Sequence, residues 1–515
     1  MTDSTGASAA PQPFPKLPTG IEGFDVIAEG GVPAGRTTLV GGTAGSGKTI
    51  FAAQFLAEGI RQGEKGVFIT FEESPEELSR NLVSLGWDVP GWEASGAWTY
   101  VDGSPDEEAS DVVGEFDLGA LLARITRAVR QSGARRVSID GVNALFSRLP
   151  NPEKLRGELY RVSRALRELG ATTLVTAERL DDYGEVSRFG IEEFVADNVV
   201  LLRNTLQDER RRRTVEILKF RGTAHQRGEF PFTIAPERGV VVLPLSAMTL
   251  TQRSSTTRIS SGIPELDHML GGGYFRDSII LLSGATGTGK TLTVTHFIAG
   301  GVAAGDRCML FAFEESREQL VRNARSWGYD FEAMERGGLL RIIPVYPHAM
   351  PLEDHLLRMR WAIQEFKPQR VAVDSLSALE RVTSLRSFRE FMLGLTSLLK
   401  HGEIAGMVTS TAPSILGGHS VTEKHISTLT DTILLLRYVE MNGELRRGLL
   451  VLKMRGSAHD TTIREYTIDG DGLHLGVPFH GTSGILSGNI THGRAEDEEV
   501  APGEGPEPAE DLEPT

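Results

Sequence analysis

The motif GxxxxGKT occurs twice in this chain of 515 residues, as GTAGSGKT and as GATGTGKT. Each copy stands between an apolar strand-like run and an apolar helix-like run. Glycines in such a loop let backbone N–H groups surround a phosphate, the lysine reaches the β and γ oxygens, and the final threonine holds Mg²⁺. The sequence therefore predicts two nucleotide sites. Their predicted contacts are Gly42, Thr43, Ala44, Gly45, Ser46, Gly47, Lys48, Thr49 and Ile50, and Gly284, Thr286, Gly287, Thr288, Gly289, Lys290, Thr291 and Leu292.

The two loops belong to a duplication of the whole chain. An offset of 242 residues joins Thr49 to Thr291, and after a single change an offset of 234 joins Asp140 to Asp374. A repeated unit of about 240 residues has the size of a domain and not of a solenoid repeat. The chain is therefore expected to contain two related domains.

Each half alternates short β-branched runs with amphipathic stretches, as in TTLVGG followed by FAAQFLAEGIRQG. This alternation predicts an α/β fold with a mostly parallel central sheet. The predicted division is a flexible N-terminal arm at 1–16, a first domain at 17–245, a linker at 246–257, a second domain at 258–487 and an acidic, disordered tail at 488–515.

Composition narrows the classes of function. The chain has 54 basic and 69 acidic residues, and its last 25 residues alone carry nine acids and one arginine. The remaining body is only weakly acidic and offers no general basic surface, so nucleic acid is not an expected partner. The tail itself suits a solubilising role better than a partner-binding role. No stretch reaches the ~18 apolar residues of a membrane helix, and the single Cys308 suits a buried position in a reducing cytoplasm.

An acidic doublet follows the second expected strand of each half, as Glu72 with Glu73 and as Glu314 with Glu315. A carboxylate at the end of a strand beside a phosphate loop can orient and deprotonate an attacking oxygen, so these four residues are the predicted catalytic groups. The alternative is an acidic start for the helix that follows.

Asp140 and Asp374 end apolar strands that begin near an arginine. This pattern predicts carboxylates that hold the water shell of Mg²⁺. An aspartate that closes a turn is the alternative.

Related basic segments, LKFRGTAH and LKMRGSAH, occur late in the two halves. Side chains two residues apart on a strand point to one face, so Lys219 with Arg221, and Lys453 with Arg455, are expected to reach the same phosphates. A solvated surface strand is the alternative.

Taken together, the doubled loop, the FEES doublets, the late basic segments and HISTLTDT resemble the KaiC family of circadian clock proteins, from about Leu17 to Ser487. The resemblance implies paired RecA-like P-loop NTPase domains, a homohexameric double ring, and ATP between neighbouring subunits. Residues implied to contact the nucleotide of the next subunit are Arg213, Lys219, Phe220, Arg221, Thr223 and His225 in the first domain, and Arg447, Lys453, Met454, Arg455, Ser457 and His459 in the second. Ser84 and Trp327 are implied to line the base pockets.

Only the second half offers hydroxyl acceptors at the matching place, because Ser427 and Thr428 correspond to Glu193 and Phe194. The resemblance implies a slow ATPase in the first ring and, in the second, an autokinase that also removes its own phosphates. It makes Glu314 the base, Glu315 its partner and Thr422 a minor acceptor. The predicted metal contacts are Thr49, Thr291 and Glu314.

The resemblance ends after about His480, where the chain runs into its acidic segment, so KaiA is not an expected partner. A KaiB-like partner on the first ring agrees with the resemblance. Two other classes share the fold: a DNA-translocating motor, which would need basic loops toward a ring channel, and an ATP-gated scaffold without catalysis.

Overall fold

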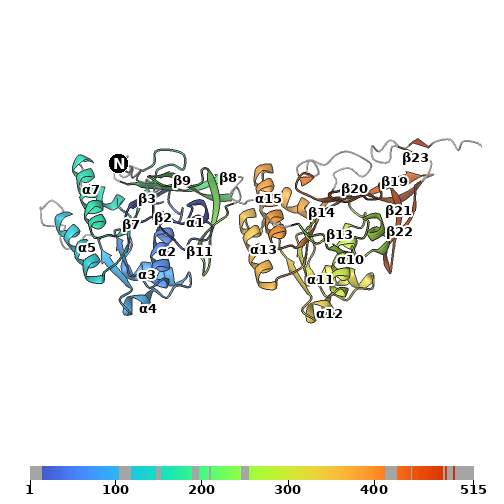
Figure 1. Ribbon diagram of the computed structural model, residues 1–515, viewed down its shortest axis with the longest axis horizontal. Helices are drawn as coiled ribbons and strands as arrows, with labels where there is room; N and C mark the ends of the chain where they lie inside the picture. Colours follow the sequence, from blue (N-terminus) through green and yellow to red (C-terminus); the bar gives the residue numbers. More distant parts are fainter. Residues whose placement is uncertain are drawn as a thin grey trace, which may run out of the picture. The chain divides into compact units, whose positions relative to one another are not determined.

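A computed structural model of the chain describes residues 14–103, 118–146, 152–187, 196–207, 210–244, 254–411, 426–441, 443–479, 482–483 and 491–492. These residues form two compact units. Each unit holds a nine-stranded sheet with helices on both faces (Figure 1). Parallel neighbours predominate in both sheets, so the predicted α/β class is confirmed.

In the first unit, the strands at the centre and on one side of the sheet are parallel, and the other side is antiparallel. The order is β11 (Gly239–Val242), β10 (Glu229–Ala235), β9 (Arg210–Phe220), β8 (Asn198–Gln207), β3 (Thr37–Gly42), β7 (Thr172–Glu178), β6 (Arg136–Asp140), β4 (Gly66–Thr70) and β5 (Trp98–Asp102). A separate pair is formed by β1 (Lys16–Leu17) and β2 (Val32–Pro33). The helices are α1 (Phe24–Ile27), α2 (Lys48–Arg61), α3 (Pro75–Val83), α4 (Val89–Ala94), α5 (Leu118–Ser132), α6 (Asn143–Phe146) and α7 (Pro152–Glu168).

The second unit repeats this topology. Its sheet has the order β16 (Leu340–Pro344), β15 (Cys308–Ala312), β17 (Arg370–Asp374), β18 (Ala405–Thr411), β14 (Ile279–Gly284), β19 (Thr432–Met441), β20 (Glu444–Met454), β21 (Arg464–Asp469) and β22 (Gly472–Pro478). Two short pairs are β12 (Arg258–Ile259) with β13 (Tyr274–Phe275), and β23 (Thr482–Ser483) with β24 (Thr491–His492). The helices are α9 (Pro264–Met269), α10 (Lys290–Ala303), α11 (Arg317–Ser326), α12 (Phe331–Arg336), α13 (Leu352–Phe366), α14 (Leu376–Glu380) and α15 (Leu385–His401), with a 3₁₀ turn at Pro347–Ala349.

Successive residues of the central strand β3 enter different hydrophobic cores. Val40 packs in the cluster that contains Phe51 and Phe55 of α2, whereas Leu39 joins the cluster that contains Ile125 of α5 and Leu166 of α7. Because both faces of the sheet are covered, its strands are apolar without interruption. This explains why the sequence shows short apolar runs in place of strict alternation.

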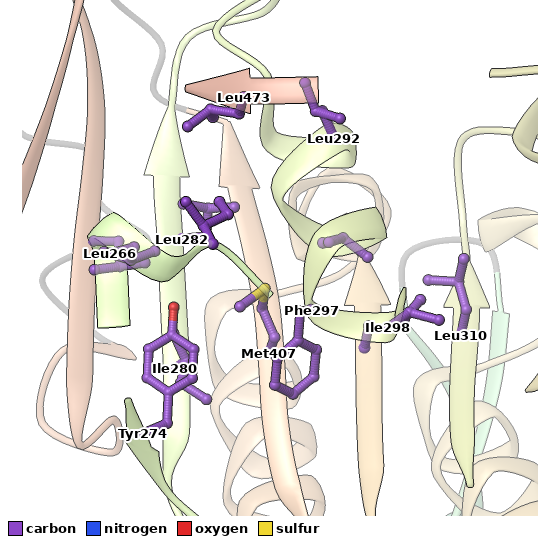
Figure 2. Packing of buried hydrophobic residues seen from close by; sticks show 14 of the residues in the cluster. Leu266, Tyr274, Ile280, Leu282, Leu292, Phe297, Ile298, Leu310, Met407 and Leu473 are labelled. Carbon is purple, nitrogen blue, oxygen red and sulfur yellow. The ribbon is translucent and has the colours of Figure 1, made fainter. Parts of the chain in front are cut away.

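The second core has the same construction around α10. Figure 2 shows Leu292 and Phe297 of this helix in one hydrophobic cluster with Ile280 and Leu282 of β14. Cys308 is fully buried in this core, as its apolar surroundings in the sequence predict.

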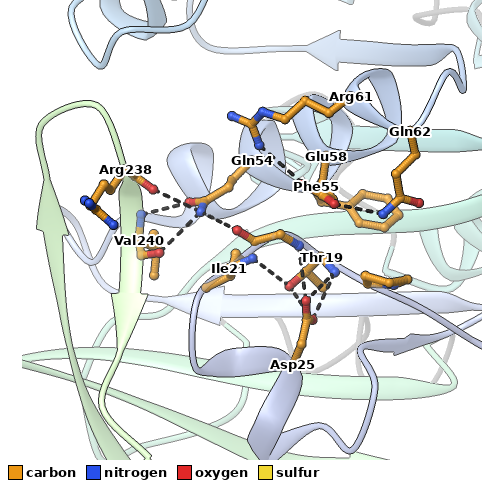
Figure 3. A network of polar contacts seen from close by, with 12 residues as sticks. Thr19, Ile21, Asp25, Gln54, Phe55, Glu58, Arg61, Gln62, Arg238 and Val240 are labelled. Atoms are coloured by element: carbon orange, nitrogen blue, oxygen red, sulfur yellow. Dashed lines mark hydrogen bonds and ion pairs between the residues drawn. The ribbon is translucent and has the colours of Figure 1, made fainter. Parts of the chain in front are cut away.

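A buried glutamine joins the phosphate-loop helix of the first unit to the last hairpin of its sheet (Figure 3). Gln54 Nε2 donates to the carbonyl oxygens of Gly20 and Arg238 at 3.0 and 3.1 Å, and its Oε1 accepts from the N–H of Val240 at 2.8 Å. Buried amide groups need such partners. A Cβ on Gly239 would lie 2.4 Å from Oε1, so only glycine fits beside the amide.

Candidate nucleotide sites and acceptor turn

Each phosphate loop joins a central strand to a helix and takes its shape from glycine. Gly45 and Gly47 have φ values of +70° and +92°, and Gly287 and Gly289 have +81° and +93°. These left-handed conformations favour glycine. A Cβ on Gly47 would also meet Ile234 Cδ1 at 2.9 Å. The loops therefore have the backbone form that directs N–H groups toward a phosphate.

The loop lysines are held over the loops that they follow. Nζ of Lys48 and of Lys290 donates to the carbonyl oxygens of the first two loop residues at 2.8 to 3.0 Å. Burial lowers the pKa of both ammonium groups, and the nearby Asp140 and Asp374 carboxylates oppose that change. A partly desolvated cation beside a ring of backbone N–H groups fits a polyphosphate.

The threonine that ends each motif contacts the predicted acidic residue. Thr49 Oγ1 donates to Asp140 at 2.9 Å, and Thr291 Oγ1 donates to Asp374 at 2.8 Å. Burial raises the pKa of both aspartates, and their hydrogen bonds to threonine counteract it. Hydroxyl and carboxylate oxygens suit Mg²⁺, which keeps several water ligands. The described residues hold no group of three or more His, Cys, Asp or Glu placed to bind a metal ion.

Several predicted loop residues face the protein interior. Ser46 and Thr288 are fully buried, and Leu292 is buried in the second core, while Ile50 packs against the first. Thr288 Oγ1 donates to the carbonyl oxygen of Ala285 at 2.8 Å. The backbone of these residues, and not their side chains, is what they can offer a nucleotide.

The acidic doublets lie at the carboxyl ends of β4 and β15, before the caps of the following helices. Ser74 caps α3 in a reciprocal pair with Glu77, and Ser316 caps α11 with Gln319 in the same way. The alternative that the doublet itself caps the helix is therefore wrong. A Ser followed three residues later by Glu or Gln is the usual form of this cap.

Corresponding glutamates have different surroundings in the two units. Partial burial and the charge of Asp140 raise the pKa of Glu72, which stays accessible. A Cβ on Gly141 would lie 2.8 Å from Glu72 Cγ, and the second unit has Ser375 at that position. Glu314 forms an ion pair with Arg381.

The second glutamate of each doublet is held by an asparagine. Glu73 accepts from Asn81 and Glu315 from Asn323, both at 2.9 Å. Burial, followed by the charge of Asp374, raises the pKa of Glu315. In the second unit Glu314, Glu315, Tyr346, His348 and Arg381 line a cleft of ≈ 540 Å³ beyond the ends of the parallel strands.

The late basic residues lie at opposite ends of the strands of each sheet. Arg213 and Arg447 lie at the end that carries the phosphate loop, and Lys219 and Lys453 lie at the other end, which we call the far edge. Arg213 lies near the start of the antiparallel strand β9, and its Nε donates to the carbonyl oxygen of Gly45 in its own phosphate loop at 3.2 Å. Arg447 pairs across β19 and β20 with Tyr438, whose hydroxyl donates to the carbonyl oxygen of Thr286 at 3.3 Å. These two arginines are therefore close to the loop of their own domain.

Lys219 and Lys453 lie at the far edge. Phe220 pairs with Asn198, and Asn198 pairs with Thr38 near the start of β3, whereas the phosphate loop follows the end of β3. Six strand residues span about 20 Å. The same register holds around Met454 in the second unit. Lys219 thus cannot reach a nucleotide on its own loop.

Lys219 and Lys453 lie on strands, as the alternation predicts, whereas Arg221 and Arg455 lie just beyond the strand ends. That each pair reaches the same phosphates stays a prediction. The strands β9 and β20 end at Phe220 and Met454, which are buried, and a glycine with φ near +72° turns the chain directly after Arg221 and Arg455. The rest of each segment stays at this edge. Ser457 Oγ accepts from Arg258 at 2.6 Å, and burial lowers the pKa of His225. Thr223 and His459 are partly exposed in the same loops.

The residues predicted for the base pockets end two matching helices. Ser84 is the C-terminal cap of α3, and its Oγ donates to the carbonyl oxygen of Asn81 at 2.7 Å. Trp327 is the cap of α11 and packs against the second core.

Ser427 and Thr428 lie in a turn of residues 426–430 that leads into β19, which we call the acceptor turn. Asp431 directly after it is joined to the start of β14, since the N–H of Ile279 donates to its carboxylate at 3.0 Å. The acceptor turn therefore lies at the same far edge as Lys453. Glu193, Phe194 and Thr422 lie outside the described residues.

Two acidic residues near the first loop were missed in the sequence. Glu178 ends β7 beside Gly42, and its charge acts on Lys48 and Glu72. Asp182 accepts from Thr43 Oγ1 at 2.8 Å. The available signal was a difference between the halves, because Glu178 pairs with Gly42 where the second half has Thr411 paired with Gly284.

Strand order, phosphate loops and Thr–Asp pairs together define two tandem P-loop nucleotide-hydrolase domains of the RecA-like type. The family model described as "ATPase: KaiC" matches residues 17–247 and 259–477. The chain belongs to the KaiC family of ATPases.

Similar proteins extend over nearly the whole chain. It is 61% identical over 474 residues to the circadian clock protein KaiC3 of Synechocystis sp., which covers 92% of this chain and 94% of that protein. It is 55% identical over 477 residues to the circadian clock oscillator protein KaiC of Thermostichus vulcanus, with 92% of each chain covered. Within the part of the chain that the structure describes, no helix has the length and apolar character needed to cross a membrane.

Proposed function

We propose that this protein is a cytoplasmic, homohexameric ATPase whose second domain phosphorylates its own Ser427 and Thr428 and later removes those phosphates, in circadian-type timing. Residues 17–245 would form the hydrolytic domain and residues 258–487 the autokinase. Support comes from the family and from relatives named as circadian clock proteins. A KaiB-like protein is the proposed partner, and KaiA is not.

One observation carries the proposal: in each domain the phosphate loop lies far from the segment at the far edge of the sheet. That segment contains Lys219 in the first domain and is the acceptor turn in the second. In the second domain the strand β14 lies between Lys290 and the acceptor turn, and its six residues span about 20 Å. Phosphoryl transfer needs the acceptor oxygen in line with the γ-phosphate. Transfer would therefore run between subunits, which supports a closed ring.

The residues of the second domain would divide the reaction among them. The loop N–H groups and Lys290 bind the phosphates of ATP, and Glu314 takes the proton of the acceptor hydroxyl. The hydroxyl oxygen then forms the new bond to the γ-phosphorus, the bond from that phosphorus to the bridging oxygen breaks, and ADP leaves. Thr291 and Glu314, with a water shell at Asp374, would hold Mg²⁺, which would supply positive charge to the phosphate oxygens.

In the first domain, water would take the place of the hydroxyl. Glu72 is the proposed base and Glu73 its partner, with Mg²⁺ held by Thr49. A carboxylate with a raised pKa is a better general base near neutral pH. The pKa of Glu72 is raised, which agrees with this role.

A mixing experiment tests the proposal. Lys290→Ala chains keep their acceptors but lose the donor site, and Ser427→Ala/Thr428→Ala chains keep the donor site but lose the acceptors. After incubation with ATP and Mg²⁺, mass spectrometry is expected to find phosphate on the Lys290→Ala chains only when both proteins are mixed. Phosphate on neither protein in the mixture, with the wild type also unmodified, would refute the autokinase.

A further inference from the structure

We propose that Lys453 and Arg455 are positioning residues that fix the backbone of the acceptor turn and decide which hydroxyl, that of Ser427 or of Thr428, meets the transferring phosphoryl group. This inference rests on the autokinase function proposed above. It gives both side chains a task within their own subunit, in addition to contact with the neighbour's nucleotide.

Three carbonyl oxygens of the acceptor turn accept hydrogen bonds from the two cations. Lys453 Nζ donates to the carbonyl oxygens of Ser427 and Thr430 at 2.6 and 2.7 Å, and Arg455 Nη2 donates to that of Thr428 at 2.8 Å. Hydrogen bonds from charged donors are roughly twice as strong as neutral ones. The turn is therefore held from the end of β20 and not only by its own bonds.

These contacts fix the two peptide groups that flank Thr428. The carbonyl of Ser427 belongs to the peptide group before Thr428, and the carbonyl of Thr428 to the one after it. With both planes held, φ and ψ of Thr428 are set, and with them the direction of its Cα–Cβ bond and the rotamers open to its hydroxyl group. Ser427 shares only the first of these planes, and the carbonyl before it, that of Ile426, accepts from the N–H of Leu429 at 2.8 Å.

The base of the turn is anchored as well. Asp431 forms an ion pair with Lys400 at 2.9 Å, and its backbone carbonyl accepts from the N–H of Arg455 at 2.9 Å. Arg455 Nη1 lies 3.7 Å from the Asp431 carboxylate. The guanidinium is thus held between the carboxylate and the carbonyl of Thr428, which suits its planar, forked shape.

The first domain has the same cations and lacks acceptor hydroxyls. Lys219 donates to the carbonyl oxygen of Ala196 at 3.2 Å, which matches the bond from Lys453 to Thr430. Anchoring by the lysine is thus common to both halves. In the second half it acts on a turn that carries two adjacent hydroxyls, so the same bonds gain a consequence for phosphoryl transfer.

The test measures initial phosphorylation rates in chains with one acceptor, at saturating ATP. Ser427→Ala chains report on Thr428, and Thr428→Ala chains report on Ser427, each with and without Arg455→Gln. Because transfer is sensitive to displacements of about 1 Å, Arg455→Gln is expected to lower the Thr428 rate about tenfold more than the Ser427 rate. Lys453→Gln is expected to lower both rates, since its carbonyl partner lies between the two acceptors.

Controls separate positioning from nucleotide binding and from misfolding. Arg446→Gln changes an arginine at the other end of β20 that pairs with Glu444 and Glu465, and it is expected to leave both rates unchanged. Arg455→Lys keeps a charged donor and is expected to restore part of the Thr428 rate. Equal losses at both acceptors in assembled Arg455→Gln protein would overturn the inference while leaving the autokinase intact. Absence of phosphate in the wild type would overturn the autokinase itself.

Discussion

The backbone N–H of Leu473 donates a hydrogen bond of 3.0 Å to Nε2 of His296. In the first domain, Val240 and Gln54 are joined in the same way at 2.8 Å. Nε2 accepts in this arrangement, so the neutral ring carries its proton on Nδ1, which lies 2.9 Å from the hydroxyl of Tyr329. One backbone contact between the phosphate-loop helix and the last hairpin is thus made by an amide in one domain and by an imidazole in the other.

The second domain is expected to lose stability in mild acid because of His296. Burial, followed by the charge of His474, lowers the pKa of His296 to about 4. The unfolded chain takes up the proton near pH 6.5. The stabilisation of the folded state by the neutral His296 ring is therefore complete above about pH 6.5 and is lost as the pH falls toward 4. We expect a loss on the order of 2 kcal/mol, with allowance for the part of the ring that water reaches.

Thermal unfolding of the wild type and His296→Gln between pH 7 and pH 4.5 checks this prediction. The first domain has a glutamine, Gln54, at this position, so the variant is expected to fold. Its stability is expected to depend less on pH than that of the wild type. Equal dependence in both proteins would exclude His296 as the cause.

Replacement of the buried Arg370 by alanine is expected to destabilise the second domain by about 3 to 5 kcal/mol. Its Nε contacts Asp306 at 3.0 Å, and Nη1 donates to the carbonyl oxygens of Ser260 and Phe297 at 2.7 and 3.1 Å. The substitution removes this buried donor from a carboxylate and two backbone carbonyls, and Asp306 keeps another cation, Arg276, at 3.4 Å. Arg341→Ala, which removes an exposed ion pair with Glu365, is the control and is expected to cost less than about 1 kcal/mol. Similar denaturant midpoints for the two variants would contradict the prediction.

Thr43 and Asp182 are expected to act as a unit in ATP hydrolysis by the first domain. Asp182 also accepts from the N–H of Asn204 at 3.0 Å, and Arg179 donates to the carbonyl oxygens of Asp182 and Gly184, so the carboxylate is firmly placed beside the loop. Thr43→Ala and Asp182→Ala are each expected to slow hydrolysis several-fold, and the double variant no more than either.

A double-mutant cycle on single-turnover hydrolysis, in chains that also carry Glu314→Gln, measures this coupling. We expect about 1 kcal/mol, as for a hydrogen bond between partly buried groups. Additive effects would mean that the two residues act separately.

Substitution of Glu72 and substitution of Glu314 are expected to affect ATP hydrolysis and autophosphorylation separately. Glu72→Gln is expected to reduce ADP production by about 10²- to 10⁴-fold while phosphate still accumulates on Ser427 and Thr428. Glu314→Gln is expected to abolish that phosphate while most ADP production remains. Glu76→Gln, an exposed residue in the first turn of α3, is the control. Loss of both activities in Glu72→Gln would contradict a division between the domains.

The sheets could be predicted from sequence because their strands are buried on both faces. Val371, Ala372 and Val373 form a continuous apolar run, and Asp374 marks where that run leaves the core. The phosphate loops could be predicted because their chemistry is local: glycine, lysine and threonine act within eight successive residues. Boundaries of the domains and the roles of the site residues stay predictions.

What could not be predicted depends on pairing between distant strands. The separation of Arg213 from Lys219 follows from the antiparallel return of β9, which local periodicity does not encode. The different settings of Glu72 and Glu314 involve Arg381, which pairs with Glu314 and lies far from it in sequence. Such differences between corresponding residues can be recognised only when their neighbours in space are known.

If phosphoryl transfer runs between subunits as proposed, the strand β14 that holds the acceptor turn away from Lys290 also makes each phosphate evidence of assembly. A subunit that has never met another could then carry ATP indefinitely and remain unphosphorylated. A phosphorylated subunit would, at some time, have been assembled with a neighbour. The degree of phosphorylation would then rise with protein concentration as well as with ATP concentration, so that it would report how abundant the protein is.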